Sequence, residues 1–416
     1  MRRKPPAWSL IERLFGPYRG LDPQVLWLVF CNLLFLGARL AVLTFLSIYF
    51  VRGQGLPAAL VGVAFLVEST ARAVASPVAG ALSDRLGRLP LLVASALGAA
   101  ILVPAFLIVH DPLVLFAWSV AVGLVQAPFF PVSAALLIDL VPAERQQRAF
   151  ALNYTGLSLG FTLAIIPAGF LAERDFVLLG LASGMTYLLI PIVAVVALRG
   201  VARPRRFAGD IGVLAGSVLA FRDRAFVGFA LLASALPISL GILAAALPLY
   251  AADVGVPTRD IGLVLAVNGV LVVLLAVPVN AALEPFGPFR SLPYAALLVA
   301  ATYALFAVAP NVTGLFAALV IFSVGEVIFS AALPVAVAAL APAGARGSYQ
   351  GAWGMAFALS IGSALFIAGL GRDSVGWPAT WAGFVAFTLA AGVGLAVFRG
   401  RLGSVSATRA AAAAPD

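Results

Sequence analysis

The stretch Gly80–Pro90, with the sequence GALSDRLGRLP, lies between two apolar runs that are each long enough to cross a lipid bilayer. Spans of about 20 apolar residues that are joined by so short a polar segment must return into the membrane at once. The stretch is therefore predicted to be the turn of a transmembrane helical hairpin. Gly80 and Gly87 allow the two backbones to approach closely, and the Asp84 carboxylate can accept hydrogen bonds from the start of the next helix.

The composition extends this prediction to the whole chain. Of its 416 residues 63% are hydrophobic and 10% are charged, and the mean hydropathy is +1.09. A soluble protein of this size could not bury so much apolar surface, so we expect an all-α integral membrane protein. The apolar runs fall in two sets of six, at 24–50, 58–82, 89–109, 113–141, 148–172 and 176–198, and then at 225–251, 258–283, 291–309, 313–341, 347–371 and 377–398.

These runs divide the chain into five predicted parts. They are an amphipathic, basic amino-terminal segment (1–23), a first six-helix bundle (24–198), a polar linker (199–224), a second six-helix bundle (225–398) and a tail (399–416).

The distribution of basic residues predicts the orientation. With the amino terminus inside, 20 of the 26 Lys and Arg residues fall on the cytoplasmic side, four fall in outer loops, and Arg39 and Arg72 lie within spans. Short loops with a basic excess stay in the cytoplasm, and Arg85 and Arg88 hold the first hairpin turn there. We therefore expect both termini on the cytoplasmic side of a plasma (inner) membrane.

The two halves repeat at an offset of 200 residues. Asp84 and Gly87 are matched by Glu284 and Gly287 in the corresponding loop of the second half. Internal duplication of this kind is typical of secondary transporters, whose halves rock about a central site. The repeat therefore predicts two pseudo-symmetric halves.

The hairpin turn GALSDRLGRLP closely resembles the loop between helices 2 and 3 of the major facilitator superfamily, with Leu89 where a basic residue is usual. The resemblance implies twelve helices and alternating access, and the twelve-helix drug:proton antiporter branch is the most similar. Two positions depart from the antiporter pattern. Ser119 replaces an arginine that is frequent on helix 4, and Ile166 precedes Pro167 where a Gly-Pro pair ends the helix 5 signature.

Three ionisable residues are predicted to meet in the first half. Arg39 on helix 1 and Glu68 on helix 2 lie at about the same membrane depth, and Arg72 follows Glu68 by one helical turn. Charged groups at this depth are candidate functional sites. The cluster has either a structural role, as an ion-pair lock between helices 1 and 2, or a role in binding substrate in the cavity.

Glu326 on helix 10 has no cation within one helical turn of sequence. Burial disfavours its charged form, so we expect it to exchange protons or to bind a cation. Similar glutamates on helix 10 occur in the drug:proton antiporter branch, and the resemblance implies a coupling carboxylate. The alternative is a buried acid that holds two helices together.

A cytoplasmic gate is predicted at the inner ends of helices 2 to 4. Asp139 lies about one turn from the end of helix 4, and the family resemblance implies that an acid there engages the loop between helices 2 and 3. This gate would hold the outward-open state; the alternative is that Asp139 merely extends to the interface. The predicted gate residues are Gly80, Asp84, Arg85, Gly87, Arg88 and Asp139.

Several uncharged residues are further candidates for the cavity. Gln126 and Asn268 are candidates for hydrogen bonds with a substrate, together with Asn32 and Gln350. Polar residues at this depth more often form hydrogen bonds between helices. The aromatic candidates for a cavity wall are Phe129, Phe130, Tyr154 and Trp353. Pro128 and Pro131 predict a kink in helix 4.

The leading functional hypothesis is proton-coupled export of amphipathic or drug-like small molecules. The rival within transport is an anion or small-metabolite carrier that binds its substrate with Arg39 and Arg72. A non-transporting receptor or a membrane enzyme is a distant alternative. A receptor lacks room for a soluble domain here, and no triad can be assembled around the lone His110.

The sequence also sets expectations about partners. One cysteine, Cys31, and one histidine exclude a disulfide framework and multi-histidine metal sites. No phosphate-binding motif is present, so we expect no cofactor and an ion gradient, most simply of protons, as the energy source. The arginines are scattered through short loops, which argues against nucleic acid. The expected partners are a small-molecule substrate and the bilayer, with a monomer as the functional unit.

Overall fold

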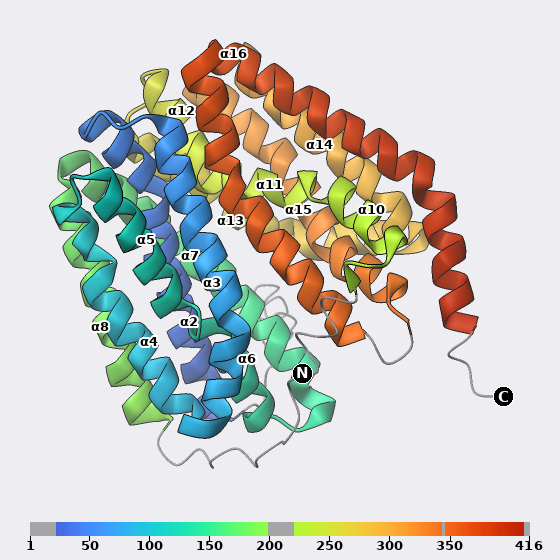
Figure 1. Cartoon of the computed structure of the whole chain (residues 1–416), viewed down its shortest axis with the longest axis horizontal. Coiled ribbons are helices and arrows are strands. Elements are labelled where there is room, and N and C mark those ends of the chain that lie inside the picture. Colours follow the sequence, from blue (N-terminus) through green and yellow to red (C-terminus); the bar gives the residue numbers. More distant parts are fainter. Residues whose placement is uncertain (1–21, 199–219, 343–345, 412–416) are drawn as a thin grey trace, which may run out of the picture.

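The computed structural model describes residues 22–198, 220–342 and 346–411, and all regular structure within those ranges is helical (Figure 1). The predicted amino-terminal segment and most of the predicted linker lie outside the described residues. The prediction of an all-helical membrane protein is confirmed.

The helices follow the predicted spans closely. In the first half they are α2 (Pro23–Ile48) with a π-helical extension η2 (Tyr49–Gly53), α3 (Ala58–Leu86), α4 (Arg88–Leu102), the 3-10 helix η3 (Pro104–Ile108), α5 (Pro112–Gln126), α6 (Phe129–Leu140), α7 (Ala143–Arg174) and α8 (Phe176–Ala197). In the second half they are α10 (Arg224–Ala233), α11 (Ala235–Gly241), the π-helix η4 (Ile242–Ala246), α12 (Leu247–Asp253), α13 (Thr258–Leu283), the 3-10 helix η5 (Glu284–Phe286), α14 (Pro288–Val308), α15 (Val312–Leu340) and α16 (Arg346–Ala411).

Eleven helical stretches among the described residues are long and apolar enough to cross a membrane. The last of them, Ser348–Ser406, has 59 residues, whereas one span needs about 20. Gly376 interrupts it with a φ of 79°, and α16 reverses its direction at the upper end of the molecule in Figure 1. This stretch is therefore long enough for the last two predicted spans. Beyond them, α16 continues as a helix to Ala411, into the segment predicted to be a tail.

The predicted kink in helix 4 is confirmed. α5 ends at Gln126 and α6 begins at Phe129, with Pro128 between them. Proline has no backbone N–H and its ring clashes with the preceding turn, so the helix is broken at this point. Phe129 is fully buried and stacks on Phe35 with 3.6 Å between ring centroids, and Trp353 is 5% exposed. In this conformation both rings are covered by packing, and a role for them in a cavity wall stays a prediction.

The repeat at 200 residues extends to the details of the fold. α3 and α13 begin at Ala58 and Thr258, and the turns after them contain glycines with positive φ, Gly87 at 97° and Gly287 at 68°. Glycine adopts this conformation without the steric cost that a side chain would add. The two halves therefore share one helical plan in these elements.

The halves meet along α3 with the first part of α16, and along α7 with α13. Backbones approach closely at these crossings: a Cβ on Gly62 would lie 2.3 Å from the Phe366 backbone, and one on Gly262 would lie 2.7 Å from the Ile165 carbonyl oxygen. Small residues permit such packing in membranes. In Figure 1, α3 and the first part of α16 lie together at the upper end and diverge toward the lower end. The hydrogen bonds observed between described residues of opposite halves all lie toward the upper end.

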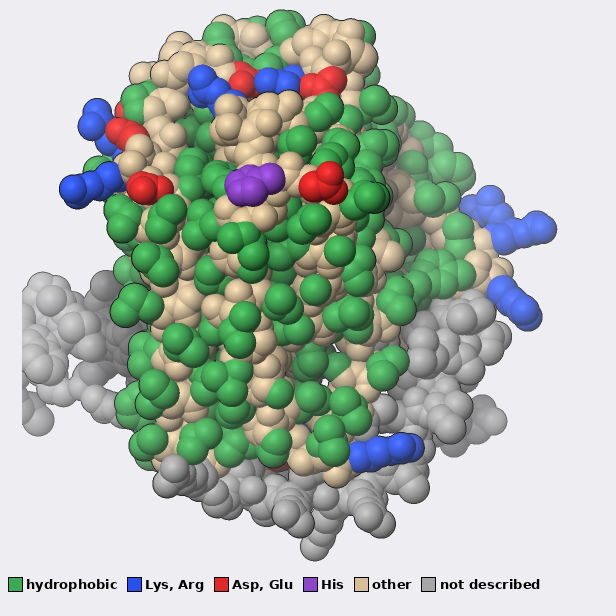
Figure 2. Space-filling model, turned by 60° about the vertical axis from the view of Figure 1, so that its left-hand side comes forward, with side chains coloured by type: hydrophobic (Ala, Val, Ile, Leu, Met, Phe, Trp, Pro, Cys, Tyr) green, Lys and Arg blue, Asp and Glu red, His purple; other side chains and the backbone are tan. Residues whose placement is uncertain are grey.

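The outer surface is mostly apolar, as a lipid-facing surface must be. Figure 2 shows a broad field of hydrophobic side chains on the side of the first half that comes forward, with charged side chains near its upper edge. Large apolar residues such as Ile101 (72% exposed) and Met185 (70%) are part of the exposed surface. In water they would be unfavourable, whereas in a bilayer they face lipid chains.

Candidate functional site

The first polar cluster joins α2 and α3 inside the first half. Arg39 Nη1 lies 2.9 Å from Glu68 Oε1, and Arg39 Nη2 lies 3.2 Å from Glu68 Oε2, so the pair is bidentate. Arg72 Nε lies 3.3 Å from Glu68 Oε1. The three side chains are 10%, 7% and 24% exposed in the order Arg39, Glu68, Arg72. The sequence placed these residues at similar depth, and the structure brings them together; their role remains a prediction.

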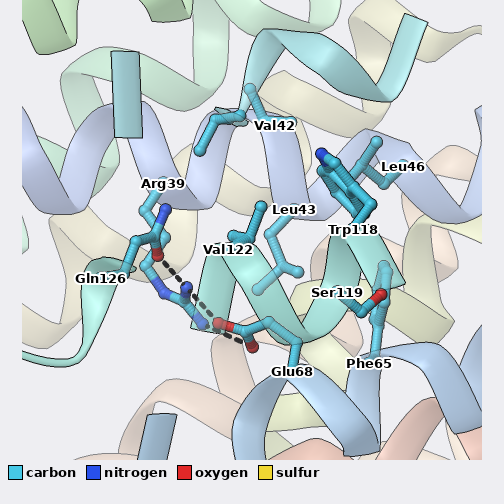
Figure 3. Close-up of a pocket in the computed structure, with 11 residues that line it drawn as sticks. Arg39, Val42, Leu43, Leu46, Phe65, Glu68, Trp118, Ser119, Val122 and Gln126 are labelled. Atoms are coloured by element: carbon cyan, nitrogen blue, oxygen red, sulfur yellow. Dashed lines mark hydrogen bonds and ion pairs between the residues drawn. The ribbon is translucent and has the colours of Figure 1, made fainter. Parts of the chain in front are cut away.

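Gln126 extends this cluster to α5 and α8. Its Oε1 accepts a hydrogen bond from Arg39 (Figure 3). Its Nε2 lies 3.2 Å from the Tyr187 hydroxyl oxygen. Gln126 is the last residue of α5, immediately before the proline break, and this break ends the helix beside Arg39. Sequence reasoning missed Tyr187; the only signal was a polar hydroxyl within an apolar span. The Arg39 guanidinium of α2 thus contacts side chains of α3 and α5, and Gln126 connects α8 to them.

A small cavity adjoins this cluster. Arg39, Glu68 and Gln126 line one part of it, and the rest of its wall is mostly apolar (Figure 3). Its volume of about 30 Å³ holds water but no drug-sized molecule, for which sites of roughly 300–1,000 Å³ are usual. In this conformation the cavity beside the cluster has no room for an organic substrate.

The second polar cluster lies in the other half and is built around the carboxyl group of Glu326. Asn268 Nδ2 on α13 lies 2.8 Å from Glu326 Oε2 on α15, and 3.1 Å from the Ser323 hydroxyl oxygen. No ion pair of Glu326 is recorded among the described residues. The predicted cavity residue Asn268 is therefore a partner of Glu326 and not of the arginine cluster.

The two clusters are related by the internal repeat. Glu68 corresponds to Asn268 and Gln126 to Glu326, so each half pairs one carboxylate with one amide, in exchanged positions. The cations are not repeated, because the counterparts of Arg39 and Arg72 are Ser239 and Val272. The first carboxylate is held between two guanidinium groups, whereas the second has an amide and a nearby hydroxyl. The absence of the two arginines from the second half is visible in the sequence at the 200-residue offset. Only the structure shows which carboxylate each arginine and amide contacts.

Among the predicted gate residues, the structure describes a contact between Arg88 and Asp139. Arg88 Nε lies 2.5 Å from Asp139 Oδ2, which ties the start of α4 to the end of α6. The side chain of Asp84 lies outside the described residues, Gly80 lies within α3, and Arg85 is exposed. Arg88 and Asp139 belong to the same half. Their ion pair therefore fixes a turn within that half and does not by itself connect the two halves.

The upper end has two contacts that sequence reasoning missed. The backbone N–H of Ala59, at the start of α3, donates to Asp373 Oδ2 at 3.0 Å. The backbone N–H of Arg259, at the start of α13, donates to Glu173 Oε2 at 2.7 Å. The two donors are 200 residues apart, and so are the two acceptors. Each half thus caps a helix of the other with a carboxylate, and a carboxylate is favourable at the positive end of a helix. We refer to these contacts as the reciprocal caps.

The described helices, their twofold repeat and two buried polar clusters are typical of a membrane transporter built of two related helical halves. The family model of the Major Facilitator Superfamily matches residues 28–240 and 229–414, and the chain belongs to this superfamily.

Several curated relatives are similar over most of their length. Multidrug resistance protein MdtH of Cronobacter sakazakii is 28% identical over 350 residues, covering 81% of this chain and 84% of the relative. The same protein of Klebsiella pneumoniae (strain 342) is 27% identical over 368 residues, covering 86% and 90%. The uncharacterized MFS-type transporter YqjV of Bacillus subtilis is 24% identical over 316 residues, covering 74% and 77%.

Solved transporters share the fold. A peptide transporter POT in complex with sulfate superposes with a TM-score of 0.75 at 15% identity, covering 93% of this chain and 96% of that one. Nucleoside transporter NupG superposes with a TM-score of 0.70 at 15% identity, covering 90% and 98%. These relatives and neighbours are transporters and not enzymes, in agreement with the sequence analysis.

Proposed function

We propose that this protein exports amphipathic or drug-like small molecules in exchange for protons, by alternating access. The observation that carries the proposal is the contrast between the two buried carboxylates. Glu68 has two guanidinium partners, whereas Glu326 has an amide and no recorded cation. An acid without a cation at membrane depth is a default candidate for a proton relay. The substrate class is supported by the MdtH relatives, which are named multidrug resistance proteins.

Glu326 is the proposed proton-exchanging group. It contacts Asn268 within its own half. A change in the position of the halves would alter its access to water, and with it the balance between its charged and neutral forms. The coupling needs no cofactor, because the proton gradient supplies the energy.

The proposed orientation follows the basic residues. Arg85, Arg88 and Arg290 lie at the turns after α3 and α13, and we assign their side of the molecule to the cytoplasm of the plasma membrane, with both termini there. With this orientation the hydrogen bonds between the halves lie toward the extracellular side, and we assign this conformation to the state that is closed there. Arg88 and Asp139 would act in the outward-open state by holding the turn after α3 in shape for contact with the other half.

The reciprocal caps would hold the extracellular side closed. Replacing both Glu173 and Asp373 by alanine should shift the population toward the outward-open state by roughly 10-fold, at about 0.5–1 kcal/mol for each cap. The readout is the distance between spin labels on cysteines placed at Val78 and Met355, at the lower end, in a Cys31→Ser background. We expect the shorter distance to gain population.

A matched control for the caps is Asp260→Asn, which alters the ion pair with Arg259 at the same end and leaves both cap carboxylates in place. It should leave the distance distribution unchanged. An unaltered distribution in the double alanine variant would show that the caps do not hold this state.

A second function, an anion carrier, is favoured by one observation. The arginine cluster has a net positive charge, and Arg72 is its most exposed member. In that case Arg72→Glu should abolish anion transport and leave transport of a lipophilic cation partly intact. Under the leading proposal the cluster is structural, so the same variant should impair both substrates equally. The measurement is uptake of labelled anion and labelled cation in proteoliposomes.

A further inference from the structure

A pocket lies at the lower end of the second half, away from both polar clusters. It has a volume of about 300 Å³ and is formed by the turn before α14 and by the last turns of α16. The residues that line it are Phe286, Gly287, Pro288, Phe289, Arg290, Arg399, Gly400 and Gly403. Two of these are arginines, and none of these described lining residues is acidic.

The arginines of this pocket differ from the basic residues of the equivalent turn in the first half. There, Arg88 is bound to Asp139. The residues 200 positions later are Pro288 and Ala339, so the second half has no equivalent of that ion pair at these two positions. It has instead Arg290, which is exposed, and Arg399 from α16, also exposed. No ion pair of either arginine is recorded among the described residues.

The remaining lining groups also favour an anion. The first turn of α14 lines the pocket, and no side chain caps that helix. α14 has 21 residues, so its positive end adds to the field of the two guanidinium groups. Arginine presents several N–H donors in a planar arrangement that matches phosphate oxygens.

The position of the pocket selects the kind of anion. Arg399 directly follows the last predicted span, at the level where phospholipid headgroups lie. Above it, α16 presents apolar side chains, Val397 at 71% exposure and Val393 at 63%. Phe286, at the pocket itself, is 50% exposed. Charged donors at headgroup level with an adjoining apolar surface fit a molecule that has both a phosphate and acyl chains.

We propose that this pocket binds the phosphate of an anionic phospholipid of the cytoplasmic leaflet, through Arg290 and Arg399. The acyl chains of the lipid would lie along the apolar surface of α16. The proposal concerns a lipid site and is independent of the transported substrate and of proton coupling.

The test is native mass spectrometry of the delipidated full chain in detergent, titrated with phosphatidylglycerol, with phosphatidylcholine, and with inorganic phosphate. Phosphatidylglycerol should bind in preference to phosphatidylcholine. Each arginine near a membrane surface contributes a factor of about five, so Arg290→Gln with Arg399→Gln should weaken binding roughly 30-fold.

The matched control is Arg401→Gln, an exposed arginine on the same helix that does not line the pocket. It should retain nearly the affinity of the unmodified chain. All variants replace exposed side chains and should keep the melting temperature, which is measured alongside. The proposal is overturned if the double variant binds phosphatidylglycerol normally, if the control loses as much as the double variant, or if inorganic phosphate binds as well as the lipid.

Discussion

Replacing Glu326 by glutamine is expected to abolish gradient-driven accumulation of a lipophilic cation in everted membrane vesicles. Glutamine keeps the size of the side chain and can still pair with Asn268, but it cannot exchange a proton. Uphill transport should therefore fall to the level of vesicles without the protein. Binding of the cation, measured on purified protein, should change only a few-fold, because substrate contacts are left in place.

The control for this prediction is Asp260→Asn, which removes a carboxylate at the upper end of α13, outside both polar clusters. Its transport should equal that of the unmodified chain. Undiminished uphill transport by the Glu326→Gln variant would exclude Glu326 as the coupling group and would return it to a structural role beside Asn268.

The second large effect concerns stability. Arg39→Met should lower the free energy of unfolding by about 3–5 kcal/mol, because Glu68 and Gln126 lose the guanidinium that they share. For a half of this size that corresponds to a fall in melting temperature of roughly 10 °C in detergent. The measurement is thermal unfolding followed by near-ultraviolet circular dichroism.

A double variant, Arg39→Met with Glu68→Met, separates the ion pair from the packing. It removes the charges of Arg39 and Glu68. Arg72 keeps its charge, but its side chain is 24% exposed and can contact water. Most of the lost stability should return, since an apolar pair replaces a buried charge without a partner. If the single variant melts normally but fails to transport anions, the lock is wrong and the arginines bind substrate.

The spans could be predicted from the sequence because lipid leaves the backbone few choices. Each apolar run must satisfy its own hydrogen bonds, so helix positions follow from hydropathy alone. The kink of helix 4 followed from Pro128 in the same way. The meeting of Arg39 with Glu68 was predictable from their equal depth on two antiparallel helices, and that of Glu68 with Arg72 from their spacing of four residues.

The contacts between helices were harder to predict. Gln126 and Asn268 appeared equivalent in sequence, yet one bonds to Arg39 and the other to Glu326. Which neighbour a polar side chain meets depends on helix rotation, and hydropathy does not fix rotation in an apolar chain. The burial of Phe129 against Phe35 likewise depends on helix rotation, which the sequence does not fix.

The reciprocal caps were missed because they depend on the packing of the two halves. Glu173 and Asp373 lie at helix ends, where acids are common and unremarkable in sequence. Their equivalence at the 200-residue offset was visible, but nothing in the sequence showed that each carboxylate reaches a helix of the opposite half. The roles of the clusters and caps remain predictions.

Proton coupling is tested most directly in proteoliposomes that contain the unmodified chain, an internal pH dye and an imposed pH gradient. Lipophilic cations, neutral amphiphiles and organic anions are added in turn. The proposed antiport predicts that cations or amphiphiles cause proton movement across the membrane at a rate that rises with their concentration. Exchange of an organic anion at a rate independent of pH, with no compound moving protons, would contradict it.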